Sequence, residues 1–161
     1  MRVVFVHGAC VRDGSWWWHR AAALLQERGV PSVTPLLPSC GETGVPGGAD
    51  GAGLVEDVAA VREVLLGGDE PTVVVAHSYG GIVTAEAAAG VDAVWHLLLV
   101  SSYLPEVGQS LSDFGPDDGP APFLEVDPAA GTFGVRPELF VDTFLADCDA
   151  DIQAQGLDHL A

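Results

Sequence analysis

The serine at position 78 lies in a local sequence that could activate its hydroxyl group. It is the centre of Ala76-His77-Ser78-Tyr79-Gly80, a G-x-S-x-G pattern with alanine in the first place. In this pattern a strand turns sharply into a helix, and small residues on either side of the serine avoid collisions within the turn. The hydroxyl then projects above the sheet, where it could attack a carbonyl carbon. The alternative is a serine that only caps the following helix.

A second stretch could supply the hydrogen-bond donors that this chemistry needs. The first apolar run of the chain leads into His7-Gly8-Ala9-Cys10. In serine-dependent sites of this layout, a loop after an early strand and the residue after the nucleophile each give one backbone N–H to the oxyanion. We therefore expect Ala9 and Tyr79 to provide these N–H groups, with Gly8 allowing the backbone to approach closely. Taken alone, His7-Gly8 is equally well explained as a strand-ending turn.

The base that would accept the proton of Ser78 is harder to find. Histidine is the most frequent choice, and the chain has five. Four are expected to pack, to lie on the surface or to point away from the serine hydroxyl: His7, His19, His77 and His96. Only His159 follows Ser78 as the order serine, acid, histidine requires. Its place two residues before the end of this sequence, where chains fray, disfavours it as the base.

The elements that must position these residues follow from apolar runs and glycine stops. Four runs predict strands, at residues 2–7, 31–37, 72–77 and 94–101. Helical patterns between them lie at residues 18–28, 54–66 and 80–90. All but the second strand are continuously apolar, as expected for strands buried on both faces of a sheet, and two prolines place the second at an edge. The alternation predicts an α/β fold with an open, mostly parallel sheet flanked by helices.

Two segments do not belong to this alternation. Residues 38–53 are rich in glycine but match no phosphate-binding motif, so we expect a loop. From residue 104 the chain is rich in Pro, Gly and Asp and then becomes acidic and amphipathic, which predicts a small lid at 104–161 over a core at 1–103. Because no further buried run follows, we expect this sequence to stop after the lid. Further strands of the sheet, and the acid and histidine that would activate Ser78, would then lie beyond Ala161.

Charge and cysteine content narrow the possible partners. Six basic residues against 23 acidic ones give a net charge of −17, which disfavours nucleic acid and anionic membrane surfaces. The three cysteines form no C-x-x-C pair, so we expect no metal site and a reducing, cytoplasmic location. We also expect no cofactor and no membrane span, whereas a homodimer that covers an open sheet edge is conceivable.

These motifs together resemble the α/β-hydrolase superfamily. Within it they are most similar to small esterases related to plant methylesterases and hydroxynitrile lyases, with their bacterial relatives. Three stretches carry the resemblance: residues 7–10 followed by Gly14-Ser15-Trp16, residues 76–81, and Tyr103-Leu104-Pro105. The chain departs from the family pattern in Ala76 and in the extra length of Val11-Arg12-Asp13.

The resemblance implies a function and a set of residues. Ser78 would be the nucleophile of a carboxylesterase acting on a small neutral ester, with Ala9 and Tyr79 forming the oxyanion hole. It also suggests Cys10, Trp16 and Ser102 as pocket residues. Two alternatives remain open: a catalytically silent protein that binds a small ligand, and a lyase of the hydroxynitrile type.

Overall fold

A computed structural model describes residues 1–115 and 119–160. Its centre is a four-stranded sheet in the order β2-β1-β3-β4, in which every pairing is parallel. The strands are β1 (Arg2–Val6), β2 (Ser32–Val33), β3 (Thr72–His77) and β4 (Val94–Val100). The predicted parallel α/β sheet is therefore confirmed, and β2 is a short edge strand as its prolines indicate.

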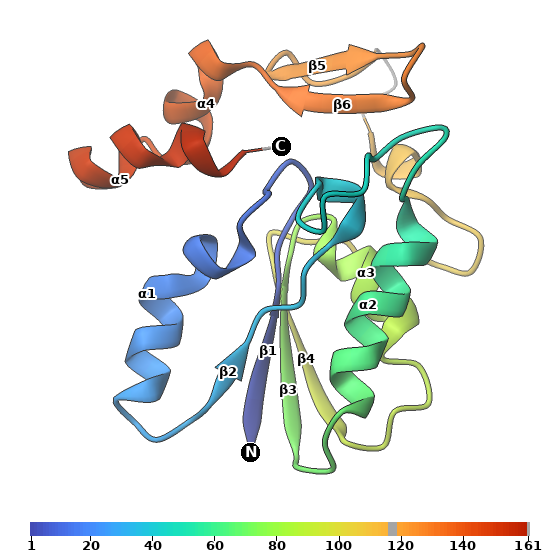
Figure 1. The fold of residues 1–161 in the computed structure, drawn as a ribbon, viewed down its shortest axis with the longest axis vertical. Coiled ribbons are helices and arrows are strands. Elements are labelled where there is room, and N and C mark those ends of the chain that lie inside the picture. Colours follow the sequence, from blue (N-terminus) through green and yellow to red (C-terminus); the bar gives the residue numbers. More distant parts are fainter. Residues whose placement is uncertain (116–118, 161) are drawn as a thin grey trace.

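Helices cover both faces of this sheet (Figure 1). Alternate side chains of β1 separate the core into two clusters, because successive residues of a strand point to opposite faces. Val4 and Val6 pack with α2 (Leu54–Leu66) and α3 (Gly80–Ala87). Val3 and Phe5 face α1 (Gly14–Gln26) instead. Strand β1 is thereby held between two packed layers.

The first helix begins four residues earlier than its apolar pattern predicts. Asp13 precedes the helix, and its Oδ1 accepts a hydrogen bond from the backbone N–H of Trp16 at 2.9 Å. Such a cap satisfies one of the N–H groups that a helix start leaves without a partner. The three tryptophans at 16–18 therefore lie within α1, and the ring of Trp18 stacks on Phe5 with centroids 4.7 Å apart.

The prediction that β4 is buried on both faces is wrong. Trp95 and Leu98 are 65% and 54% exposed, and His96, expected to be satisfied in the core or at an edge, is also exposed. Within the described residues β4 pairs with β3 on one side only. Helix α3 packs mainly against α2, β3 and β1.

The segment after residue 104 lies over the carboxyl ends of the strands (Figure 1). It contains an antiparallel hairpin that its composition does not predict, formed by β5 (Leu124–Asp127) and β6 (Thr132–Val135). Two helices follow, α4 (Pro137–Phe144) and α5 (Ala150–Gly156), and a last turn of 3₁₀ helix, η3, covers Leu157–His159. Other 3₁₀ turns lie at Leu111–Phe114 (η2) and, inside the predicted loop, at Pro38–Cys40 (η1).

Residues 116–118 and 161 of the predicted lid lie outside the described residues. No helix in the described part of the chain is long and apolar enough to cross a membrane.

Candidate functional site

The turn between β3 and α3 holds Ser78 in a strained backbone conformation. Its φ is +51°, in the left-handed region that side chains other than glycine rarely adopt. The other non-glycine residues with positive φ in the described chain, Cys10 and Ser101, follow the neighbouring strands β1 and β4. Strain of this kind persists only where the surroundings hold it, and it gathers at functional sites. In the described α3 no side chain caps the N-terminus, so the Ser78 hydroxyl is not a helix cap.

Neighbouring strands hold this turn in place. The backbone N–H of Ser78 bonds to the carbonyl of Ser101 at 3.2 Å, and the Ser102 hydroxyl donates to the carbonyl of Ser78 at 2.6 Å. On the other side, a Cβ at Gly80 would lie 2.6 Å from the carbonyl oxygen of His7. Only glycine permits this approach of α3 to the end of β1.

The loop after β1 approaches Ser78 closely. A Cβ at Gly8 would lie 3.0 Å from the Cβ of Ser78, so a larger residue would crowd the serine. Ala9 and Cys10 follow and line a cavity beside it. Among the hydrogen bonds of the described residues, none uses the backbone N–H of Ala9 or of Tyr79. The two N–H groups expected at an oxyanion site thus have no acceptor in the part of the chain that the structure describes.

A buried ion pair supports the same loop from below. The ring of His7 is fully buried, with Nδ1 2.8 Å from the carbonyl oxygen of Gly8 and Nε2 2.8 Å from Oε2 of Glu42. Glu42 also accepts the backbone N–H groups of Gly14 and Leu37. Burial opposes ionisation of Glu42, but the hydrogen bond and charge of His7, with these N–H groups, hold its pKa below its usual value. Each ring nitrogen of His7 thus has an oxygen within hydrogen-bond distance.

The cavity beside Ser78 has a volume of about 500 Å³. One wall comes from the core, through Cys10, Trp17 and His77, and the opposite wall comes from residues after 104, with Phe123, Phe133, Phe140 and Phe144 among them. No Asp, Glu, Lys or Arg is among the described residues that line it. A cavity of this size and character suits an uncharged organic ligand.

His77 lines the cavity but has no hydrogen bond to Ser78 in the described structure. Its ring stacks on Trp17 with centroids 6.0 Å apart, and its buried Nδ1 lacks a partner among the described residues. Burial, and then the charge of His7, lower the pKa of His77, so the ring is neutral near pH 7.

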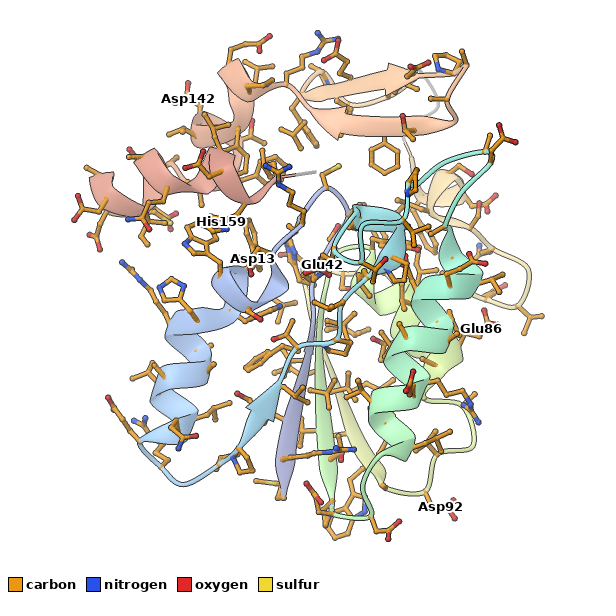
Figure 2. All side chains as sticks on the ribbon, viewed as in Figure 1. Asp13, Glu42, Glu86, Asp92, Asp142 and His159 are labelled. Carbon is orange, nitrogen blue, oxygen red and sulfur yellow. The ribbon has the colours of Figure 1, made fainter. Side chains whose placement is uncertain are left out.

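His159 packs against the start of α1. Its Nδ1 is 3.0 Å from Oδ2 of Asp13, and its ring stacks on Trp16 at 4.3 Å with an angle of 10° between the planes. Figure 2 shows His159 and Asp13 side by side. Its neighbour Leu160 lines the cavity, whereas His159 is not among the described lining residues. Within the described residues, then, no histidine occupies the position of a base for Ser78.

The remaining predicted pocket residues have different places. Cys10 lines the cavity, and burial, with the charge of Cys40 adding to it, raises the pKa of its thiol to about 12. Trp17 takes the cavity position that the sequence assigns to Trp16, because α1 begins at Gly14 and turns Trp16 towards His159. Ser102 is not among the described lining residues; it supports the backbone of Ser78 instead.

Two buried acids at the site are missed by sequence reasoning, Glu42 and Asp57. Asp57 accepts the hydroxyl hydrogen bond of Tyr79 at 2.8 Å, which turns the tyrosine ring into the core rather than the cavity. The sequence gives little indication of either acid. Asp57 lies one turn inside an otherwise apolar face of its helix, which is a weak signal of a buried role. Glu42 lies in a glycine-rich loop, where no pattern distinguishes it. Among the described residues no three His, Cys, Asp or Glu side chains gather as metal ligands.

Comparisons with known proteins identify the fold and the family. A model of the alpha/beta hydrolase family matches residues 3–160. A search of curated proteins with the sequence found no significant match. Solved structures with a similar fold include an extracellular α/β-hydrolase from a Paenibacillus species, described as sharing structural and functional homology with Tobacco Salicylic Acid Binding Protein 2. It is 20% identical with a TM-score of 0.79, over 100% of this chain and 66% of that one.

Two further structures show the same relationship. Polyneuridine aldehyde esterase is 18% identical with a TM-score of 0.77, over 99% of this chain and 68% of its own. A pyrethroid hydrolase from Sphingobium faniae JZ-2 is 18% identical with a TM-score of 0.75, over 94% of this chain and 63% of its own. The chain thus spans about two thirds of the length of the structures it resembles. With a parallel sheet flanked by helices and a family match over nearly its whole length, the chain belongs to the alpha/beta hydrolase family.

Proposed function

We propose that Ser78 is the nucleophile of a carboxylesterase, with the N–H groups of Ala9 and Tyr79 as its oxyanion hole. The observation that carries the proposal is the strained Ser78 at an apolar cavity, together with the N–H groups of Ala9 and Tyr79, which no acceptor among the described residues uses. Attack of the hydroxyl on an ester carbonyl would place negative charge on the carbonyl oxygen. Each donor aimed at that charge typically lowers the barrier by roughly 3 kcal/mol.

The reaction also needs a base for the serine proton and a group to orient that base. The described residues place no histidine at the Ser78 hydroxyl, and the similar structures are longer than this chain. We therefore propose that a histidine and a carboxylate outside the described residues complete the site. Tests of the proposal accordingly use the longest natural form of the protein.

The cavity favours a neutral ester with an apolar acid or alcohol group. Its described lining is uncharged, and several phenylalanines after residue 104 form the wall opposite the sheet. Its volume of about 500 Å³ would admit an ester that carries an aromatic group. We further propose that the segment after residue 104 acts as a lid over the substrate.

Ser78→Ala tests the nucleophile. We expect the natural protein to hydrolyse p-nitrophenyl esters and to react with a fluorophosphonate probe, which labels activated serines. The substitution should remove the labelling and lower ester turnover by at least about a thousandfold.

Ser15→Ala is a matched control, because Ser15 is an exposed serine of α1 and is not among the described lining residues. It should leave both signals unchanged. Ester turnover that survives Ser78→Ala would show that another group is the nucleophile.

A silent binding protein is the second candidate, favoured by the lack of a histidine at Ser78 among the described residues. It predicts that an apolar ester binds and is recovered intact, with no labelling of Ser78. Equilibrium binding of phenyl acetate, followed by chromatography of the recovered ligand, separates the two functions.

A further inference from the structure

Asp57 is a fully buried carboxylate that the proposed reaction does not use. It lies on α2 with no exposed surface. Its Oδ1 accepts the backbone N–H of Ser39 at 2.9 Å, and its Oδ2 accepts the hydroxyl of the same serine at 2.5 Å. The hydroxyl of Tyr79 donates to Oδ2 as well, at 2.8 Å. Burial of a charge is costly unless several hydrogen bonds compensate it, so the position is held by three donors.

Tyr79 connects this carboxylate to the candidate site. Its backbone follows directly after Ser78, and its N–H is one of the two proposed oxyanion donors. Its ring lies in the opposite direction, within the core cluster beneath α3. Burial, and then the charge and hydrogen bond of Asp57, raise the pKa of the Tyr79 hydroxyl, which therefore stays protonated and remains a donor. One residue thus has its backbone at the site and its side chain bonded to a buried acid.

We propose that Asp57 is a positioning residue for the oxyanion hole, acting through Tyr79. The inference rests on the proposed function. A serine at a φ of +51° relaxes unless its neighbours hold it, and Tyr79 is the neighbour on the helix side. By fixing the tyrosine ring, Asp57 limits the rotation of the peptide that carries the N–H. Donors of this kind act because they are oriented before the charge develops.

Tyr79→Phe removes this connection while it keeps the ring and the backbone N–H. In the longest natural form of the protein we expect kcat to fall about tenfold or more, with KM changed less than twofold, because the donor is needed only in the transition state. The rate of fluorophosphonate labelling should fall by a similar factor. Asp57→Asn should shift both rates in the same direction, and Tyr79→Phe remains informative if the Asn variant does not fold.

Val61→Ala is the control for a merely structural role. Val61 lies one turn after Asp57 on α2, is fully buried and is not among the described residues that line the cavity. Its truncation should lower the melting temperature and leave kcat of the folded protein unchanged. A Tyr79→Phe variant whose kcat equals that of the parent overturns the inference, while loss of turnover in Ser78→Ala would leave the proposed function standing. Turnover that survives Ser78→Ala would overturn both.

Discussion

At the scale of single residues, His7 connects the core to the proposed oxyanion site. Its Nδ1 donates to the carbonyl of Gly8, which belongs to the same peptide group as the N–H of Ala9. A hydrogen bond to that carbonyl fixes the peptide plane and draws electron density from the N–H, making it a better donor. Glu42 keeps the ring in place through Nε2. A histidine that cannot reach Ser78 as a base can still serve the site through the backbone.

Glu42→Gln should weaken this support and destabilise the fold. The change leaves the buried His7 without its anionic partner, which we expect to lower the free energy of unfolding by about 3 kcal/mol at pH 7. Folding lowers the pKa of Glu42, so its stabilising effect is complete above the ordinary value of 4.5 and is lost as the pH falls through the lower folded value. The difference between parent and variant should therefore shrink below pH 4.5, as measured by urea unfolding at several pH values.

Glu27→Gln is the comparison for this measurement, since Glu27 is exposed at the end of α1. It should change the free energy of unfolding by less than about 0.5 kcal/mol. A Glu42→Gln variant as stable as the parent at pH 7 would show that the ion pair contributes no net stability.

At the scale of elements, the turn from β3 into α3 depends on the contact between α3 and the end of β1. Gly80 makes this contact, and the carbonyl oxygens of Val6 and His7 leave no space for a side chain there. The position of Ser78 relative to the loop after β1 is thus set by the approach of a helix to a strand.

Gly80→Ala tests this dependence. The substitution has two opposing effects on the stability of the fold. Alanine in a helix is favoured over glycine by about 1 kcal/mol, but overpacking against β1 typically costs about 2 kcal/mol. We expect net destabilisation in urea unfolding, together with slower fluorophosphonate labelling as Ser78 moves away from the loop.

The matched substitution is Gly67→Ala at the end of α2, where an added Cβ would make only ordinary contacts at 3.4 Å. It should be close to neutral. If Gly80→Ala is equally neutral, the close approach does not constrain the turn.

The sequence predicts elements well where one signal dominates. Residues 72–77 and 54–66 match β3 and α2 because the first is a continuous apolar run and the second has helical spacing that stops at glycine. The hairpin of β5 and β6 is not predicted, since its four-residue strands contain few apolar residues and their partners are set by packing over the sheet. The sequence indicates Ser78 and Gly8 as candidates because the pattern around each is local in the chain. It does not indicate Glu42 and Asp57, because each acts on a residue more than twenty positions away.

At the scale of the whole molecule, the sheet has one unprotected side. Among the described residues β4 has no strand on its outer side, and Trp95, Leu98 and Val100 are exposed along it. Unpaired backbone groups beside apolar side chains are a template for pairing with another chain. The net charge of −17 opposes such pairing between copies, but β4 itself contains no Asp, Glu, Lys or Arg.

Leu98→Lys should reduce the self-association of the 161-residue chain. A lysine on an exposed edge adds repulsion and hydration there, while stability should change by less than about 0.5 kcal/mol because Leu98 is 54% exposed. Sedimentation velocity over a range of concentrations measures the effect. Leu66→Lys, at a comparably exposed leucine on α2, should leave association unchanged. Equal association of the Leu98 variant and the parent would show that β4 is not the contact.

The described lining of the cavity has no charged side chain, whereas the chain as a whole is strongly acidic, and this contrast bears on the end of the proposed reaction. Hydrolysis of a neutral ester leaves a carboxylate anion, and the described cavity lining contains no cationic side chain to retain it. The field of a chain with a net charge of −17 repels that anion, whereas a neutral ester is hardly affected. The charge of the chain would therefore leave the binding of a neutral ester almost unchanged, while it would favour the release of the carboxylate product over its rebinding.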